Sequence, residues 1–358
     1  MSHTKELMRE ALDKIKEHLG RQHSGSLDYS ARRTGVNEYL NKLGMQIIRF
    51  DEWKTVYQKC GSALGKLSSL EFLELANVHR DRFDEVYGCL VDRDSKETFN
   101  WYVQYRTAYA FIGDEAYELF TPAITRQDWA EMEKRIRRKS RGVYEIGDFT
   151  IDTRNIGDLI GTFCLEQYRY KDIVEPAIGE VVLDIGASVG DTSLWFSKKV
   201  GSTGKVYAFE PEPKNFQILL GNIEQNNVKN VTPLNIGLSD REGRMKIVSG
   251  GSASFLAESE GEAEVTVTTI DEFVRDNKLP KVDFIKMDVE GHEMNVLRGA
   301  NETMRAFKPK MALSAYHRGD DLVTLPKLLI TINEDYKFYL GHFAPSWTDT
   351  VLFATISA

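Results

Sequence analysis

Two acidic residues, Asp184 and Glu210, each follow a short apolar stretch in the middle of the chain. Residues 181–183 and 206–209 have the continuous apolar character of strands that are buried on both faces in a parallel sheet. The carboxylate of Asp184, at the end of the first strand, suits an ammonium group. That of Glu210 can accept both hydroxyls of a ribose, as the corresponding acid does in nucleotide-binding units.

The residues after the first strand predict a tight turn into a helix. Gly186 and Gly190 frame this turn around Ala187, at a spacing that differs from the dinucleotide fingerprint G-x-G-x-x-G. Backbone amides near Asp191 and Thr192, at the start of the helix, can bind a carboxylate. An amino acid joined to a nucleoside satisfies all of these groups, so the pattern predicts an S-adenosylmethionine site. The alternative is that glycine only serves the turn.

Three residues at the end of the third predicted strand, 231–236, or shortly after it extend this site. Asn235, Gly237 and Asp240 lie where the carboxyl end of that strand should meet the nucleoside. We expect them to flank the adenine.

Candidate catalytic residues follow the fourth and fifth strands of the predicted sheet. Methyl transfer to a hydroxyl needs a group that removes the proton. His317 has the side chain whose ordinary pKa lies nearest neutrality, although a histidine at a strand end is often only a hydrogen-bond partner. Asp288 and Glu290 are the other candidates, although the helix dipole alone also favours acids there.

One lysine, Lys286, lies inside the otherwise apolar fourth strand. A buried lysine needs a partner, and Asp288 or Glu290 is the predicted one. An alternative is that Asp288, with Glu290, Asp320 or Asp321, holds Mg²⁺ through oxygen ligands. The expected site contains no metal.

Composition excludes several classes of protein. The 358 residues are 42% hydrophobic and carry a net charge of -8, which indicates a globular chain without nucleic acid as its main partner. The basic run 134–141 is predicted to coat the exposed face and end of a helix, the alternative being a docking site for an acidic ligand. We expect the three cysteines, Cys60, Cys89 and Cys164, to be reduced and to lie in the core. No segment resembles a signal peptide or a membrane span, so we expect a cytoplasmic protein without a membrane partner.

Helical periodicity dominates the first part of the chain. Predicted helices cover residues 4–19, 45–63, 70–76, 80–90 and 95–112. Capping boxes are predicted at Ser68 with Glu71 and at Thr125 with Asp128. We therefore expect an all-helical N-terminal domain over residues 1–142, which could instead serve as an arm that joins copies of the chain into a homo-oligomer.

A predicted hairpin at 143–152, turning at Gly147 and Asp148, marks the change to an α/β domain. The helix 159–168 follows it. Strands and helices then alternate at the spacing of βαβ units. The predicted strands are 181–184, 205–209, 231–236, 282–288 and 310–316, with helices 191–199, 213–226, 271–277 and 322–333.

Two irregularities modify this parallel pattern. The sequence between Ser239 and Thr269 is rich in glycine and in residues that favour strands, and it predicts an inserted hairpin at the edge of the sheet where ligands bind. In this segment, Ser252 and Ser254 are either loop residues or part of an acceptor pocket. Strands 337–340 and 350–355 are joined by too few residues for a crossover helix, so they must pair antiparallel. Residues 143–358 are thus expected to form a Rossmann-like, mostly parallel seven-stranded sheet that ends in an antiparallel hairpin.

Several motifs of this region, from about Asp158 onward, resemble the FkbM-type methyltransferases. They occur in the family's order as VVLDIGASVGDTS, VYAFEPEPKNFQILLGNIEQNN, NIGLSDREG, TIDEFV, VDFIKMDVEGHEMNVLRGA and ALSAYH, of which IKMDVEG-x-E is the most specific. The resemblance implies a class I methyltransferase fold, S-adenosylmethionine as the donor, and O-methylation of a hydroxyl on a sugar, glycan or secondary metabolite. It says nothing of the helical first part.

Other functions would require other residues or another acceptor. A carboxylate or a peptide could replace the hydroxyl as acceptor. A nicotinamide oxidoreductase would need the pyrophosphate glycines that this chain lacks at the turn. A binding module without catalysis would have no need of acids at successive strand ends.

Overall fold

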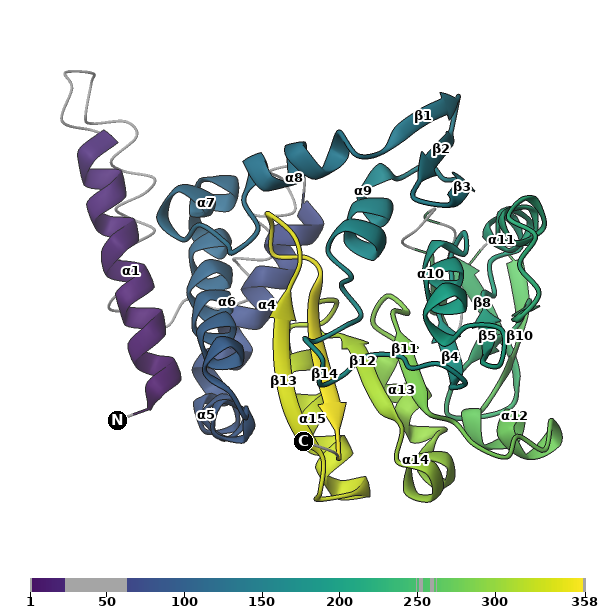
Figure 1. Cartoon of the computed structure of the whole chain (residues 1–358). Coiled ribbons are helices and arrows are strands. Elements are labelled where there is room, and N and C mark those ends of the chain that lie inside the picture. Colours follow the sequence, from purple (N-terminus) through teal and green to yellow (C-terminus); the bar gives the residue numbers. More distant parts are fainter. Residues whose placement is uncertain are drawn as a thin grey trace. The chain divides into compact units, whose positions relative to one another are not determined.

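The computed structural model describes residues 2–22, 63–248, 250, 254–257, 261 and 263–356, and the side chains of 19–22 and 63–67 are not described. Most of the predicted helix 45–63, with Cys60 and Ser252, lies outside these residues. Two compact units are present. The first comprises residues 1–84, 100–121 and 318–320, and the second comprises 85–99, 122–317 and 321–358. Each unit is described separately, and Figure 1 gives the labels of the elements.

The described part of the first unit is helical, as the sequence predicts. Its helices are α1 (His3–Gln22), α4 (Ala63–Val78), the second half of α6 (Arg93–Ile112), the 3₁₀ turn η1 (Gly113–Glu115) and α7 (Ala116–Leu119), with the first residues of α5 (Arg80–Cys89). The predicted cap at Ser68 is wrong, because α4 begins five residues earlier and Ser68 lies inside it.

Aromatic rings and one buried cation form the core of this first unit. Phe72 makes edge-to-face contacts with Phe83 and Tyr102, at ring distances of 5.5 and 5.7 Å. The fully buried guanidinium of Arg106 donates hydrogen bonds to the hydroxyls of Tyr102 and Ser68. The aromatic residues of α6 therefore contribute to this core.

The second unit contains a seven-stranded sheet with the order β13-β14-β12-β11-β4-β5-β6. Its strands are β4 (Val181–Ile185), β5 (Lys205–Phe209), β6 (Val231–Leu234), β11 (Phe284–Met287), β12 (Lys310–Ser314), β13 (Lys337–His342) and β14 (Thr350–Thr355). The five strands β4, β5, β6, β11 and β12 are parallel, and β14 runs antiparallel to both of its neighbours. The predicted mostly parallel sheet with a final antiparallel pair is confirmed.

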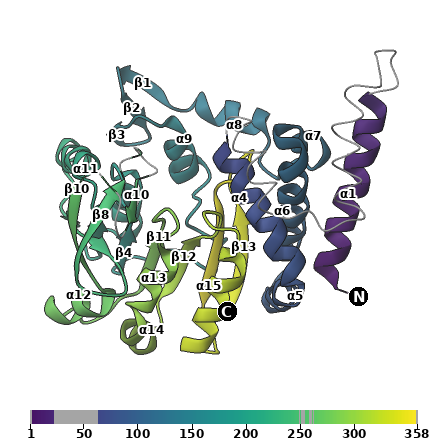
Figure 2. The ribbon, with the colours of Figure 1, turned by 180° about the vertical axis from the view of Figure 1, so that it is seen from behind.

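Helices cover both faces of this sheet (Figures 1 and 2). They are α10 (Asp191–Val200), α11 (Pro213–Gln225), α12 (Ile270–Asp276), α13 (Glu293–Arg298), α14 (Asn301–Phe307) and α15 (Asp321–Ile332). Helix α10 faces the viewer in Figure 1, whereas α13 and α15 lie on the face that Figure 2 brings forward. The central strands are buried on both faces, which explains why their sequences are continuously apolar.

The inserted segment between β6 and α12 forms a second sheet of four strands, with the order β7-β10-β8-β9. These strands are β7 (Gly237–Leu238), β8 (Gly243–Val248), β9 (Phe255–Ala257) and β10 (Ala263–Thr268). The consecutive antiparallel strands β8 and β9 are the predicted hairpin. Strand β10 pairs antiparallel with the other edge of β8, and β7 pairs parallel with β10.

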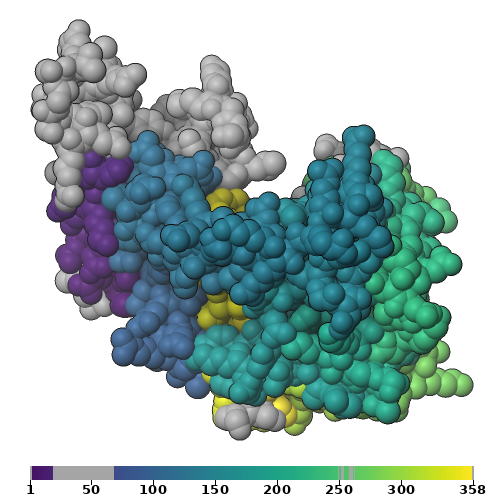
Figure 3. Space-filling model, turned by 45° about the horizontal axis from the view of Figure 1, so that its top comes forward, coloured from purple at the N-terminus to yellow at the C-terminus, as the bar shows by residue number. Residues whose placement is uncertain are grey.

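A segment before the large sheet lies over the carboxyl ends of its parallel strands. It contains α8 (Arg126–Glu133), the three-stranded sheet β1 (Arg137–Ser140), β2 (Val143–Ile146) and β3 (Phe149–Asp152), then α9 (Ile156–Leu159) and the π-helical turn η2 (Ile160–Cys164). Figure 3, with this edge tilted forward, shows the surface of the segment in blue-teal. The hairpin of β2 and β3 and the capping box of Thr125 and Asp128 are confirmed.

Two other predictions are wrong. Helix α8 ends at Glu133, so much of the basic run forms the exposed strand β1 instead of a helix end. Cys89, at the end of α5, is exposed and free instead of buried. Ile136 packs with Ile146, Ile151 and Leu194 in one apolar cluster of the second unit. Among the described helices, none has the length and apolar character that crossing a membrane requires.

Candidate active site

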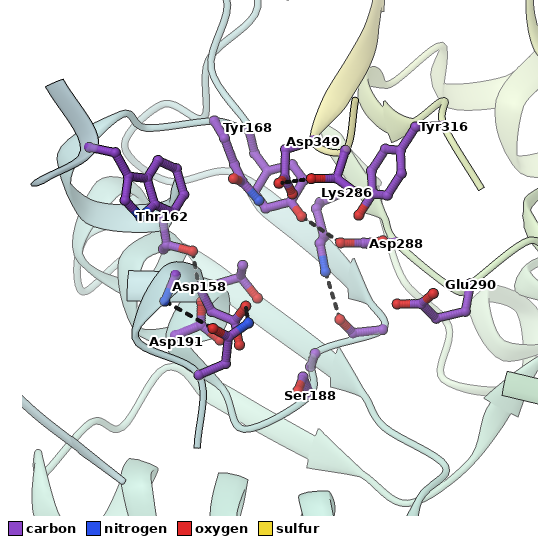
Figure 4. A pocket seen from close by; sticks show the side chains of 18 residues that line it. Asp158, Thr162, Tyr168, Ser188, Asp191, Lys286, Asp288, Glu290, Tyr316 and Asp349 are labelled. Carbon is purple, nitrogen blue, oxygen red and sulfur yellow. Dashed lines mark hydrogen bonds between the residues drawn. The ribbon is translucent and has the colours of Figure 1, made fainter. Parts of the chain in front are cut away.

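A cavity of about 320 Å³ opens at the carboxyl ends of β4 and β11. Five carboxylates line it: Asp158, Asp191, Asp288, Glu290 and Asp349. Figure 4 shows Asp158 and Asp191 on one side, and Asp288, Glu290 and Asp349 on the other, with Lys286 between them. This excess of acids favours a cationic ligand.

A second, smaller cavity of about 40 Å³ adjoins the first. Apolar side chains including Ile236, Leu238 and Val289 line it, and Glu210 provides a carboxylate there. Four residues border both cavities: Gly186, Ser188, Asp288 and Glu290. The two spaces therefore meet at the glycine turn after β4 and at the acidic turn after β11.

Glu210 closes the turn after β5. One carboxylate oxygen accepts a hydrogen bond from the backbone amide of Ser188 at 2.8 Å, and the other accepts from the amide of Glu212 at 2.8 Å. Burial raises the pKa of Glu210 to about 8, while these two amides act in the opposite direction. Each carboxylate oxygen keeps a lone pair for a further donor, so the predicted role with a ribose fits this position.

Three residues that line the main cavity have strained backbones. Ser188, Glu290 and Asp349 have φ of 48°, 54° and 60°, in the left-handed region that costs a side-chain-bearing residue about 1–3 kcal/mol. Gly186 has φ of 77°, and a Cβ there would overlap the carbonyl oxygen of Asp288. The neighbouring strand thus comes too close for any residue but glycine.

Asp184 does not border either cavity, which departs from its predicted role with an ammonium group. Strand β4 continues through Ile185, so Asp184 lies within it and pairs in register with Lys286 of β11. Its buried carboxylate accepts hydrogen bonds from the hydroxyls of Thr192 and Ser193 and lies 3.3 Å from Nζ of Lys286.

The predicted partner of Lys286 is therefore wrong. Its ammonium lies beside Asp184 and donates a hydrogen bond of 2.6 Å to the carbonyl oxygen of Gly186. Burial alone would lower the pKa of Lys286, but Asp184, Asp288 and Asp191 raise it. Lys286 thereby holds the glycine turn at the floor of the main cavity.

The carboxylates on each side of the cavity repel one another. Burial and the charge of Asp191 raise the pKa of Asp158 well above its usual value. Burial also raises the pKa of Asp191, whose carboxylate accepts a 2.7 Å hydrogen bond from Thr162. Burial and Asp288 raise the pKa of Asp349 to about 6. A bound cation would relieve this repulsion.

Asp288 and Glu290 differ in their protein partners. The hydroxyl of Tyr168 donates a 2.8 Å hydrogen bond to Oδ2 of Asp288, and Oδ1 has no hydrogen-bond partner among the described residues. Burial raises the pKa of Asp288, but His317 and Lys286 outweigh it and leave the pKa lowered. Burial raises the pKa of Glu290 to about 7, against the effect of His317.

His317 lies behind these two acids and does not border the cavity. Its Nδ1 donates a 2.8 Å hydrogen bond to Oε1 of Glu293, and its Nε2 lies 3.3 Å from Oδ1 of Asp288 and 3.5 Å from Oε2 of Glu290. Burial alone would lower the pKa of His317, but these three carboxylates raise it well above its usual value.

The remaining predicted donor-site residues divide into two groups. Ala187, Asp191 and Thr192 line the main cavity, and Gly237 lines the smaller one. Gly190, Asn235 and Asp240 border neither. They have structural contacts instead.

Those contacts explain the three residues that lie outside the cavities. Gly190 caps α10 with φ of 89° and packs against Leu219. The amide of Asn235 donates to the carbonyl of Glu210 at 2.8 Å, which fixes the turn behind the carboxylate. Asp240 pairs with Arg241 at 3.4 Å.

The two other acids considered for a metal do not border the main cavity either. Asp320 belongs to the first unit, and Asp321 is the first residue of α15 in the second. Ser254 borders the smaller cavity.

The site also contains Asp158, Tyr168 and Asp349, which were not candidates in the sequence analysis. Asp158, Tyr168 and Asp349 come from segments outside the alternating strands, and no periodic pattern connects them. Glu293 lies in the IKMDVEG-x-E motif, and only its contact with His317, 24 residues away, distinguishes it from a helix-start acid.

Comparison with known proteins adds independent information. A sequence model described as "Methyltransferase FkbM domain" matches residues 184–338. The hexuronic acid methyltransferase AglP of Haloferax volcanii is 32% identical over 174 residues, which are 45% of this chain and 70% of that protein. Methyltransferase 1 of Beauveria bassiana is 27% identical over 191 residues, or 46% of this chain and 75% of that protein.

A solved structure supports the fold. The crystal structure of an FkbM methyltransferase from Methylobacillus flagellatus KT superposes with a TM-score of 0.57 at 21% identity. The match covers 82% of this chain and 63% of that one, so this chain spans under two thirds of that protein's length. The match to AglP extends over more than two thirds of AglP. The chain belongs to the FkbM family of methyltransferases.

Proposed function

We propose that the protein transfers a methyl group from S-adenosylmethionine to a hydroxyl oxygen of a sugar, glycan or related small molecule. The observation that carries this proposal is the junction of the two cavities at Gly186, Ser188, Asp288 and Glu290. One cavity has apolar walls and a carboxylate suited to a ribose, and the other is acidic. A donor that extends through the smaller cavity into the main one and an acceptor in the main cavity would meet at the two carboxylates of the junction.

The residues fit the donor in both of its parts. Ile236 and Leu238 offer an apolar surface to the adenine, and Glu210 offers lone pairs to the ribose hydroxyls. Asp158 and Asp191 face the main cavity with raised pKa values, which a cationic ammonium group would lower again. When bound, the donor supplies an electrophilic methyl group on a positively charged sulfur.

Glu290 is the residue we assign to proton removal. It borders both cavities, and a 27% exposed side chain gives an acceptor hydroxyl access to it. Asp288 is partly occupied by Tyr168, and His317 lies behind both acids. As the bond between the hydroxyl oxygen and the methyl carbon forms, the bond from that carbon to the donor sulfur would break and the donor would leave as the neutral thioether. Oε1 of Glu290, the oxygen that does not face His317, takes the hydroxyl proton, while Asp288 and His317 keep the carboxylate in position.

A sugar acceptor is supported by one relative. AglP carries the name of a hexuronic acid methyltransferase, and it aligns with this chain at 32% identity. Sugar hydroxyls are donors that can bind to the many carboxylates of the main cavity.

Product analysis tests the proposal. The full chain is incubated with methyl-labelled S-adenosylmethionine and a panel of hexoses, hexuronic acids and glycans, and the products are identified by mass spectrometry. We expect a methyl ether, and Glu290→Gln should lower turnover by about 100-fold or more while donor binding remains. Glu264→Gln, at an exposed position of strand β10, is the control. A methyl ester or a methylated peptide as the main product would contradict the choice of acceptor.

A further inference from the structure

The cluster of His317, Asp288 and Glu290 contains buried atoms whose hydrogen bonding is incomplete. Nε2 of His317 and Oδ1 of Asp288 lie 3.3 Å apart, and neither has a hydrogen-bond partner among the described residues. The side chain of His317 is only 7% exposed. Buried polar atoms without partners are costly, and such a pair at one place indicates a missing ligand.

The spacing of these atoms matches a shared cation. Oε2 of Glu290 is the third potential donor atom, 3.5 Å from Nε2 of His317. Two ligand atoms that each lie about 2.0–2.2 Å from one divalent ion are separated by roughly 3.0–3.5 Å. An oxygen of Asp288, one of Glu293 and a ring nitrogen of His317 also lie within 4.8 Å of one another.

The surroundings orient these atoms as a metal site requires. Glu293 accepts the Nδ1 hydrogen bond of His317 at 2.8 Å and thereby directs Nε2 toward the two acids. The hydroxyl of Tyr168 binds Oδ2 of Asp288 and leaves Oδ1 facing the histidine. Ligating histidines and carboxylates in proteins are commonly held by such outer hydrogen bonds.

We infer that His317 Nε2, Asp288 Oδ1 and Glu290 Oε2 form a binding site for one divalent transition-metal ion. One imidazole nitrogen and two carboxylates suit Mn²⁺ or Fe²⁺. Both acids line the main cavity, so the ion keeps coordination positions open toward that cavity.

The ion also defines the acceptor more closely, and this step rests on the proposed function. The cavity has five carboxylates, which would repel an anionic acceptor. A divalent ion reverses that local charge and binds oxygen atoms. The preferred acceptor is therefore one that offers two adjacent oxygens, such as a vicinal diol or a hydroxyl beside a carboxylate.

Metal binding is measured on the full chain without donor or acceptor, so that its outcome is independent of methyl transfer. The chain is stripped with chelator, and Mn²⁺ alone is titrated while the free ion is followed by electron paramagnetic resonance. We expect one tight site per chain. His317→Gln and Asp288→Asn should each weaken it by about 100-fold or more, and Glu293→Gln by roughly 10–100-fold.

A matched control lies in the same cavity. Asp349→Asn removes one acid whose carboxylate bonds to Thr348, and it should change Mn²⁺ affinity less than about threefold. If the ligand variants fail to fold, electron spin-echo spectroscopy of Mn²⁺ on the unaltered chain should still detect a directly bound imidazole nitrogen. Absence of stoichiometric binding, or of that nitrogen signal, would overturn the inference and leave His317 as a counter-ion of the acids.

Discussion

Nδ1 of His317 lies 2.8 Å from Oε1 of Glu293, and the two residues come from segments that follow the adjacent strands β12 and β11. Glu293 is completely buried at the start of α13, where it also accepts a hydrogen bond from the amide of Val289. The pair fixes both the histidine ring and the turn that carries Glu290.

The first prediction concerns this pair. Glu293→Gln keeps the shape of the side chain but removes the charge that holds the His317 ring, so turnover should fall by roughly 10–100-fold. Binding of the product S-adenosylhomocysteine, measured by calorimetry, should stay within about threefold of the unaltered chain. Glu302→Gln, at the exposed start of α14, is the control. Full turnover in Glu293→Gln would show that the pair does not position the site.

Asp184 should matter for stability more than for binding. Asp184→Ala leaves the ammonium of Lys286 buried without its carboxylate, which should lower the free energy of unfolding by about 3–5 kcal/mol. Adding Lys286→Met should recover part of that loss, and urea denaturation measures both effects. Unchanged stability together with lost donor binding would instead support the role with an ammonium group that the sequence predicts.

Gly186 should tolerate no side chain. In Gly186→Ala the added Cβ would overlap the backbone of Asp288, and the residue would be held at a φ of 77°. Donor affinity and thermal stability should both fall. Gly221→Ala is a matched control, because nothing lies within 4 Å of its Cβ position in helix α11, and it should stabilise the chain by about 0.4–1 kcal/mol. Equal behaviour of the two variants would argue against a tight turn at residue 186.

His342 should make the free energy of unfolding depend on pH below its ordinary pKa of 6.5. Burial lowers its pKa from 6.5 to about 3, against hydrogen bonds with the backbone of Ala344 and Ser346. Between these pH values the unfolded chain binds a proton that the folded chain does not. The free energy of unfolding should therefore fall as the pH decreases from 6.5 toward 3.

Urea denaturation at a series of pH values compares the chain with His342→Gln. The variant should show a smaller decrease in the free energy of unfolding over that range. Identical pH dependence of the two proteins would mean that His342 is protonated equally in both states.

Much of the fold follows from the sequence because it depends on local periodicity. The buried strands, the acids at their carboxyl ends and the antiparallel pair β13 and β14 were all predicted from spacing. Asp184 was misplaced by one position: β4 continues through Ile185, and that single step moves Asp184 from the strand end into the sheet. The pairing of Lys286 with Asp184 depends on the register between β11 and β4, and the amino-acid sequence of one strand does not specify that register.

The site could be predicted only in part, for a similar reason. Glu210, Asp288 and Glu290 line the cavities because strand ends meet at one edge of the sheet. Asp158 and Asp349 reach the same cavity from distant segments through tertiary packing alone. Such contacts leave no periodic signal.

Titration of S-adenosylhomocysteine by calorimetry tests the central claim most directly. The account predicts one site per chain, and Glu210→Ala should weaken binding by about tenfold or more, because a hydrogen bond to a charged group contributes about 1.5–3 kcal/mol. Asp240→Asn, a nearby acid that borders neither cavity, should bind normally, and NADPH should not bind. Absence of binding, or equal affinity in the chain and in Glu210→Ala, would contradict the proposed donor site.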